Sequence, residues 1–230
     1  MDTGILYIVA TPIGNLGDIT LRALETLKKA DLIACEDTRV ARKLLNRYEV
    51  KTPVTSFFQH SKAPKISQII SVLKSGKNVA LVTDAGTPGI SDPGNKLVEQ
   101  AIFENIAVMP IPGSSALTAI ISVAGIDMQK FVFLGFPPHK KGRETFFKEI
   151  VALKYPAVYY ESPHRVLKNL ELLKSLGDPP AGGKNIILGR ELTKMFEEIV
   201  RGTADEVLKY FAENPGKVKG EFTIIVYPHT

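Results

Sequence analysis

Short apolar runs alternate with amphipathic segments through the first half of the chain. Most of these runs are apolar at nearly every position, as expected for strands buried on both faces of a parallel sheet. The predicted strands cover residues 5–10, 32–35, 54–58, 79–82 and 107–111. Helical spacing of apolar positions predicts helices over 21–30, 38–48, 66–73, 93–104 and 116–124, with Thr20 capping the first. This alternation predicts a parallel α/β domain in residues 1–124.

The pattern changes after residues 125–130. Strands are predicted over 131–134, 157–160, 185–188, 196–203 and 222–226, with helices ending near 176 and covering 205–211. Some of these strands follow one another without a helix between them, which favours a mixed sheet. We therefore expect a second α/β domain in residues 125–230, with a cleft between the two domains lined by strand-end loops.

The stretch 79–94 organises the first domain. Its apolar run ends at Thr83 and Asp84, and Gly and Pro residues then follow too densely for regular structure. Loops at the carboxyl ends of parallel strands bind ligands, and glycines let a ligand approach the backbone closely. An ordinary surface loop is the alternative, but so long a loop inside a compact domain needs a functional reason.

Composition sets broad limits. Hydrophobic residues make up 44% of the 230 residues and charged residues 23%, as in ordinary globular proteins. The net charge of +5 suits a polyanionic partner without requiring one. Cys35 is the only cysteine and the four histidines are scattered, so no metal site is predicted. No apolar run has the length of a signal peptide or a membrane span, which favours a cytoplasmic protein with no membrane partner.

Two basic segments are candidates for phosphate contacts. On the predicted helix 38–48 the cations share one side, and a second group precedes a helix near residue 143. A solvated surface is the alternative for both. The candidates are Arg39, Arg42, Lys43 and Arg47 in the first group, and Lys140, Lys141 and Arg143 in the second. The sequence lacks G-x-G-x-x-G after the first strand, the P-loop motif and the G-x-S-x-G elbow, so those classes lose their best support.

Five ordered motifs carry a family resemblance over essentially the whole chain. They are Thr-Pro-Ile-Gly-Asn-Leu-Gly-Asp from residue 11, Cys-Glu-Asp-Thr-Arg from 35, Thr-Asp-Ala-Gly-Thr-Pro-Gly-Ile-Ser-Asp-Pro-Gly from 83, Tyr-Glu-Ser-Pro-His-Arg from 160 and Gly-Arg-Glu-Leu-Thr-Lys from 189. Together they resemble the tetrapyrrole methylase superfamily, and within it the ribosomal RNA branch of small-subunit rRNA cytidine 2′-O-methyltransferases.

The resemblance implies two α/β domains that bind S-adenosylmethionine between them, usually in a homodimer, and methyl transfer to a cytidine ribose of small-subunit rRNA. By matching motifs, the cofactor-binding residues would be Pro12, Gly14, Asp84, Gly86, Ile90, Ser114, Ser115, Ala116, Phe136, Ser162, Leu192 and Thr193. Relatives commonly have Pro-Gly-Pro-Ser-Ala where this chain has Pro-Gly-Ser-Ser-Ala from residue 112, so which serine meets the cofactor stays open. Many members also carry a further C-terminal helical segment.

A ribose hydroxyl is a poor acid, so a general base beside it would assist transfer. Glu36, Asp37 and Asp18 follow first-domain strands and are the first candidates. Asp37 is also placed to cap the helix from Thr38, so we assign the cap to Asp37 and the chemistry to Glu36. Glu161 and Glu191 are the next candidates, and Arg165, Arg190 and Lys194 are further candidates for RNA contacts.

Two other functions compete with this interpretation. A small-molecule methylase acting on a tetrapyrrole would have the same fold, but the basic helix face and the Glu-Asp-Thr-Arg and Glu-Ser-Pro-His-Arg motifs favour RNA. A non-catalytic RNA-binding protein would not need so many strand-end loops of the kind that build a cofactor cleft.

Overall fold

The structure is a computed structural model that describes residues 3–58, 63–92, 94–176 and 184–228. The chain divides into two compact units, Met1–Ser115 and Ala116–Thr230. The division falls before the boundary predicted after Ala124. The reason is that helix α5 (Ala116–Ser122) packs against strand β10 (Phe222–Tyr227) of the second unit.

The first unit contains a five-stranded parallel sheet in the order β3-β2-β4-β1-β5. Its strands are β1 (Leu6–Val9), β2 (Leu32–Cys35), β3 (Val54–Ser56), β4 (Val79–Val82) and β5 (Val108–Ile111). Its helices are α1 (Leu21–Lys29), α2 (Thr38–Arg47), α3 (Ala63–Lys74) and α4 (Asn95–Phe103), with a short 3₁₀ helix η1 (Leu16–Asp18). The predicted parallel α/β architecture is confirmed.

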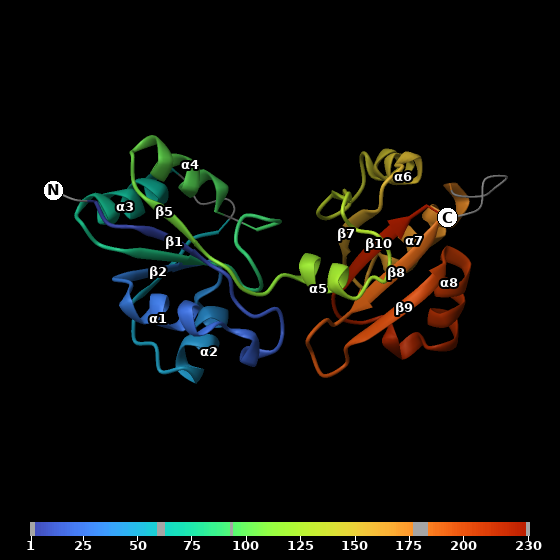
Figure 1. Ribbon diagram of the computed structural model, residues 1–230, viewed down its shortest axis with the longest axis horizontal. Helices are drawn as coiled ribbons and strands as arrows, with labels where there is room; N and C mark the ends of the chain where they lie inside the picture. Colours follow the sequence, from blue (N-terminus) through green and yellow to red (C-terminus); the bar gives the residue numbers. More distant parts are fainter. Residues whose placement is uncertain (1–2, 59–62, 93, 177–183, 229–230) are drawn as a thin grey trace. The chain divides into compact units, whose positions relative to one another are not determined.

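Helices cover both faces of this sheet (Figure 1). Along β4 the buried side chains alternate, with Ala80 and Val82 in one apolar cluster and Val79 and Leu81 in the other. The first cluster contains residues of α1 and α2, and the second contains residues of α3 and α4. Because successive strand side chains point to opposite faces, a strand covered on both sides must be apolar throughout.

The second unit contains a mixed five-stranded sheet in the order β6-β7-β10-β8-β9, as the adjacent strands in the sequence predicted. Only β6 and β7 are parallel; β10 runs antiparallel to both of its neighbours, and β9 runs antiparallel to β8. The strands are β6 (Val132–Phe133), β7 (Ala157–Glu161), β8 (Asn185–Arg190), β9 (Glu198–Thr203) and β10. The helices are α5, α6 (Arg143–Ala152), α7 (Val166–Leu176) and α8 (Ala204–Glu213), followed by the 3₁₀ helix η2 (Pro215–Lys217).

Helices α6, α7 and α8 share one apolar cluster with the strands of the second sheet, centred on buried Phe147, Leu170 and Phe211. Helix α5 approaches β8, where a Cβ on Gly189 would lie 2.8 Å from Cδ1 of Ile120. Glycine at 189 therefore lets α5 pack closely on this strand.

Several element ends differ from the sequence-based expectation. Helix α5 ends at Ser122 rather than Ala124, and β9 begins at Glu198 rather than at residue 196. Helix α4 begins at Asn95; the predicted start at Pro93 and the predicted loop 178–183 lie outside the described residues. No helix within the described ranges is long and apolar enough to cross a membrane.

The predicted cap of α1 is confirmed and gives a stability test. The Thr20 side chain accepts a hydrogen bond from the backbone N–H of Ala23, at 3.1 Å. Thr20→Ala should lower the free energy of unfolding by about 1 kcal/mol, because it leaves that N–H without its acceptor. Thr20→Ser keeps the hydroxyl and should cost much less. Urea unfolding of both variants measures the difference, and equal losses would contradict the capping role.

Candidate active site

Three loops at the carboxyl edge of the first sheet are joined by hydrogen bonds. Thr11 after β1 and Gly86 after β4 exchange backbone hydrogen bonds of 2.9 and 3.1 Å. The Thr87 hydroxyl donates to the carbonyl oxygen of Ser114 after β5, at 3.1 Å. The Ser114 hydroxyl in turn lies 3.3 Å from the Asp18 carbonyl oxygen, its acceptor. These contacts fix the backbone of all three loops as one surface.

The glycines of the loop after β4 are required by its geometry. Gly86 and Gly89 have φ values of 85° and 86°, which residues with a Cβ rarely adopt. A Cβ on Gly86 would also lie only 3.3 Å from Cγ2 of Ile13, in the loop after β1. Glycine at position 86 therefore lets the loops after β1 and β4 approach each other closely.

Carboxylates gather beside these loops. Asp84 is exposed, and its Oδ1 accepts a hydrogen bond from the backbone N–H of Asp37, at 3.0 Å. Burial raises the pKa of Glu36, and the charges of Asp84 and Asp92 raise it further. Burial and Asp84 together raise the pKa of Asp92 to about 6. Glu36 and Asp92 therefore hold a proton more readily than free carboxyl groups do, which is the setting in which a carboxylate becomes a stronger base.

Asp37 has the structural role that the sequence predicted. It is the N-cap of α2, and its carboxylate accepts hydrogen bonds from the backbone and the side chain of Arg39. The side-chain hydrogen bond from Arg39 is the main reason that the pKa of Asp37 falls to about 2. A carboxylate held in this way is a weak base, so Glu36 is the better candidate for proton transfer.

The second unit ties two of its predicted loops together through Arg165. Its Nη1 donates to the Pro137 carbonyl oxygen at 2.9 Å, and its Nη2 lies 3.0 Å from Oε1 of Glu161. The Glu161 side chain is fully buried and also accepts hydrogen bonds from Asn169 and the Ser162 backbone. Arg165 and Glu161 therefore form an internal ion pair. The guanidinium and the carboxylate are both bonded to protein groups, so neither is placed to contact RNA or to transfer a proton.

The predicted cofactor-binding residues fall in these loops and their equivalents. Pro12, Gly14, Asp84, Gly86, Ile90, Ser114 and Ser115 lie on the loops after β1, β4 and β5. In the second unit, Ala116 begins α5, and Phe136, Ser162, Leu192 and Thr193 follow β6, β7 and β8. The Phe136 ring is 54% exposed and packs on Tyr160, with ring centroids 5.3 Å apart.

Sequence reasoning did not select two polar groups of the first unit as site residues. Asp92 lies beside Asp84, and the Thr83 hydroxyl is buried with no hydrogen-bond partner among the described residues. Asp92 belongs to the motif that begins at Thr83, but only the folded structure shows that it is partly buried and close to Asp84. The described residues contain no group of three or more His, Cys, Asp or Glu arranged to hold a metal ion.

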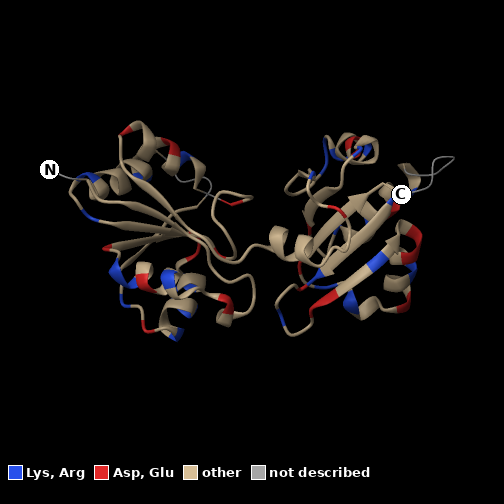
Figure 2. Cartoon of the chain, in the orientation of Figure 1, with Lys and Arg blue, Asp and Glu red and all other residues tan. Residues whose placement is uncertain are grey.

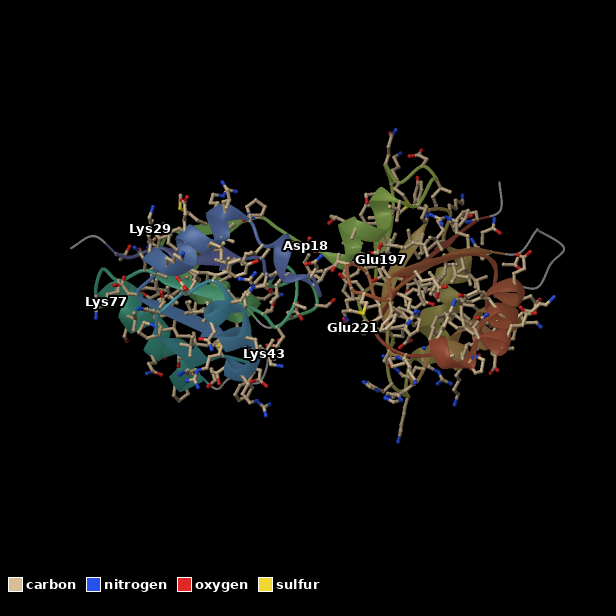
Figure 3. All side chains as sticks on the ribbon, turned by 90° about the horizontal axis from the view of Figure 1, so that it is seen from below. Asp18, Lys29, Lys43, Lys77, Glu197 and Glu221 are labelled. Atoms are coloured by element: carbon tan, nitrogen blue, oxygen red, sulfur yellow. The ribbon has the colours of Figure 1, made fainter. Side chains whose placement is uncertain are left out.

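Helix α2 presents its cations to solvent. Ala41, Leu44 and Leu45 are buried, while the predicted basic residues Arg39, Arg42, Lys43 and Arg47 are exposed. Figure 2 marks the positions of Lys and Arg along the chain in blue. Figure 3 labels Lys43 on this helix, and labels Lys29 and Lys77 at the far end of the first unit from Asp18. Of the second group, Lys140 and Lys141 are exposed and Arg143 begins α6.

The remaining basic candidates are engaged by acids. Arg190 is buried, and its Nε lies 3.4 Å from Oε2 of Glu198. Lys194 Nζ lies 2.8 Å from both Glu191 and Glu221. These side chains hold the second unit together, so the exposed cations of α2 are the stronger RNA candidates.

Similarity to known proteins identifies the family of this chain. A family model described as tetrapyrrole (corrin/porphyrin) methylases matches residues 5–208. The chain belongs to the tetrapyrrole methylase family. It is 44% identical over 226 residues to the ribosomal RNA small subunit methyltransferase I of Halalkalibacterium halodurans, covering 98% of this chain and 76% of that protein. The protein of the same name from Thermotoga maritima is 43% identical, covering 97% of this chain and 98% of that one.

Solved structures support the fold assignment. The methyltransferase CobJ superimposes with a TM-score of 0.71 at 17% identity, covering 98% of this chain and 95% of that one. Cobalt precorrin-4 methyltransferase, CbiF, superimposes with a TM-score of 0.67 at 17% identity, covering 97% of this chain and 94% of that one. At these identities the likeness concerns the two-unit α/β fold.

Enzymes of this family use S-adenosylmethionine, and the first-unit loops fit such a ligand. Its amino acid part carries an ammonium group and its sulfur is a cation, and both suit the edge that holds Asp84 and Asp92. The buried Thr83 hydroxyl has no partner among the described residues, so it can still bond a polar ligand atom. Left-handed Gly86 and Gly89 keep the backbone free of Cβ atoms there.

The pKa of Asp92 gives a testable pH dependence. Because it is higher in the folded protein, near 6, than its ordinary value of 3.8, folding favours the protonated acid. Stability therefore falls as pH rises from about 4 through 6. Asp92→Asn should raise the free energy of unfolding by about 1–2 kcal/mol at pH 8, after allowance for partial exposure, and change it little at pH 4. Urea unfolding at both pH values tests this, and an equal effect at the two would contradict it.

Proposed function

We propose that this protein transfers a methyl group from S-adenosylmethionine to the ribose 2′-hydroxyl of a cytidine in small-subunit ribosomal RNA. The observation that carries the proposal is the near full-length similarity to small-subunit rRNA methyltransferases, at 44% identity over 98% of the chain. The carboxylate edge of the first unit and the exposed cations of α2 supply chemistry that suits this reaction. The carboxylates suit a cationic methyl donor, and the cations of α2 suit a polyanionic acceptor.

S-adenosylmethionine, when bound, supplies an activated methyl group on a sulfonium. In the first unit, the donor would be held by the loops after β1, β4 and β5, with Asp84 and the Thr83 hydroxyl as its polar partners. The hydrogen bonds between Thr11 and Gly86 and between Thr87 and Ser114 pre-arrange these loops, so that little ordering is required on binding.

Glu36 is proposed as the general base. It lies directly after β2, at the carboxyl edge of the sheet, and its pKa is raised while that of its neighbour Asp37 is lowered. A base works best when its pKa approaches the working pH, and the burial of Glu36 moves it in that direction. Asp18 is exposed and contributes its carbonyl oxygen to the loop contacts, so its carboxylate is the weaker choice.

Replacement of Glu36 tests this role. Glu36→Gln should lower kcat by about 10²-fold or more and leave the Kd for S-adenosylmethionine nearly unchanged, because the amide keeps the shape but accepts no proton. Asp37→Asn is the matched control, since asparagine also caps helices and should leave turnover intact. Labelled methyl transfer measures turnover and calorimetry measures donor binding. Full turnover in Glu36→Gln would rule out this base.

Ribosomal RNA is proposed to contact the α2 face through phosphates. Exposed arginine and lysine side chains on one helix face release counterions from RNA when they bind. A 2′-hydroxyl in a single-stranded element can then be presented to the acidic edge, since proteins recognise RNA sequence mainly where bases are unpaired.

The salt dependence of binding tests this surface. Replacing Arg42, Lys43 and Arg47 together by Gln should reduce the slope of log Kd against log salt by about two, because each lost phosphate contact removes about 0.7–0.9. Lys29 and Lys77 lie at the far end of the first unit (Figure 3), so their replacement is the control and should leave the slope unchanged. Filter binding of small subunits over a salt series measures the slopes. Equal slopes in the two variants would remove α2 from the interface.

The proposal includes a homodimer, as the family resemblance implies. Sedimentation equilibrium of the purified protein measures the mass directly, and a mass of one chain at micromolar concentration would contradict this part.

The decisive experiment uses small ribosomal subunits from cells that lack this protein. They are incubated with the protein and labelled S-adenosylmethionine, and the RNA is digested to nucleosides. Label in 2′-O-methylcytidine is the expected result. Donor binding without any label on RNA would overturn the proposal in favour of a small-molecule substrate.

A further inference from the structure

The chain that leads from β6 to α6 is held against the second unit at two points. The Tyr160 backbone N–H of β7 donates to the Gly135 carbonyl oxygen, at 2.9 Å. Pro137 is buried, and its carbonyl oxygen accepts a hydrogen bond from Arg165 Nη1, also at 2.9 Å. Arg165 is in turn held by its internal ion pair. Phe136 lies between these two held residues, so the backbone that carries it is fixed on both sides.

This held backbone presents an aromatic ring to solvent. More than half of Phe136 is exposed. Its ring packs on Tyr160 with centroids 5.3 Å apart, and Tyr160 packs on Phe133 of β6 at 5.1 Å. Two further rings therefore support the Phe136 ring from the protein side. Single exposed apolar side chains are common on proteins, so the surroundings of this ring decide what it binds.

The residues around this ring are basic. Residues 128–143 contain four Lys or Arg and no Asp or Glu. Lys140 and Lys141 are exposed, and Arg143 is partly exposed. Among the residues that the structure describes, none of these three cations takes part in an ion pair. Other cations of the second unit do pair with glutamates, namely Arg165, Arg190, Lys194 and Lys217.

The two lysines lie on a turn that packs back toward the ring. The Arg143 backbone N–H donates to the Lys140 carbonyl oxygen, at 3.4 Å. Gly142 has a φ of 86°, and a Cβ built on it would lie 3.9 Å from Cγ of Pro138. The turn therefore contacts Pro138, only two residues from Phe136. The exposed ring and the unpaired cations thus belong to one local surface.

A ring beside unpaired cations has the chemistry that binds single-stranded RNA. Unpaired bases stack on aromatic side chains, and Lys and Arg bind the phosphates that flank them. Duplex RNA offers the same phosphates, but its base faces are stacked inside the helix. The ring therefore adds a preference for unpaired RNA that the cations alone would not give.

We propose that Phe136, supported by Tyr160, stacks an unpaired base of the RNA substrate while Lys140 and Lys141 bind the adjacent phosphates. The RNA partner comes from the proposed function, on which this inference rests. The second unit then has an RNA contact of its own, besides the α2 face of the first unit. The Phe136 ring serves the acceptor RNA rather than the donor, to which the family resemblance assigns it.

Replacement of the ring tests the stacking. Phe136→Leu stays apolar but loses the flat face, so Kd for a short single-stranded RNA should rise about tenfold, a factor that one lost base stack supports. Phe136→Tyr keeps the ring and should bind as the unsubstituted protein does. Phe103→Leu is the matched control, because Phe103 is an exposed phenylalanine of α4 in the first unit. Fluorescence anisotropy of labelled RNA, without donor present, measures each Kd.

Salt dependence separates the ring from the lysines. Stacking releases no counterions, so Phe136→Leu should raise Kd by the same factor at every salt concentration. Lys140→Gln combined with Lys141→Gln should reduce the slope of log Kd against log salt by about 1.4, because each single-strand phosphate contact contributes about 0.7. Replacing Lys174 and Lys209 by Gln removes the same charge from lysines that already pair with acids, and should leave the slope unchanged.

Duplex RNA and the donor supply the deciding comparisons. Phe136→Leu should leave Kd for a duplex RNA unchanged, and an equal loss of affinity for both RNAs would refute the stacking role. Calorimetry with S-adenosylmethionine gives the other readout: a raised donor Kd with an unchanged RNA Kd would assign the ring to the donor and overturn the proposal. Tight RNA binding that depends on Phe136, without methyl transfer to small subunits, would support the stacking and overturn the proposed function alone.

Discussion

The paired backbone hydrogen bonds between Thr11 and Gly86 are the contact on which the candidate site depends. They join the loops after β1 and β4, which are neighbouring strands in the sheet and far apart in the sequence. The bond from Thr87 to Ser114 adds the loop after β5. These hydrogen bonds hold the three loops together at one edge of the sheet. Glycine is favoured at position 86 because its φ is 85° and a Cβ there would lie 3.3 Å from Cγ2 of Ile13 in the loop after β1.

Charged groups divide the first unit into an acidic edge and a basic helix face. Acids follow β2 and β4 at the carboxyl edge, where burial and mutual repulsion raise the pKa of Glu36 and Asp92. Cations lie on the solvent face of the adjoining helix α2. Asp37 and Arg39 stand at the junction and neutralise each other at the helix cap. The proposed function assigns the cationic donor to the acidic edge and the anionic nucleic acid to the basic helix face.

The second unit uses ion pairs to position its loops. Glu161 and Arg165 connect the loop after β6 to the end of β7, and Glu191 with Lys194 connects the turn after β8 to β10. Each motif looked from sequence like a source of catalytic or RNA-binding side chains. In the structure the same side chains support the backbone beside Ser162 and Thr193. Charged residues in a motif can thus have a structural role, through the backbone geometry they impose.

The sequence by itself determined the strands, the helices and the parallel character of the first sheet. A run such as 79–82 is apolar at every position because both of its faces are covered, and the caps at Thr20 and Asp37 are local interactions within a few residues. The tertiary structure decided which charged groups are free. Asp92 gains its high pKa only beside Asp84 and in partial burial. Arg190 pairs with Glu198 on the neighbouring strand, and Lys194 reaches Glu221 across 27 residues of the chain. Burial and long-range pairing depend on how the elements pack, so periodicity and motifs do not contain them.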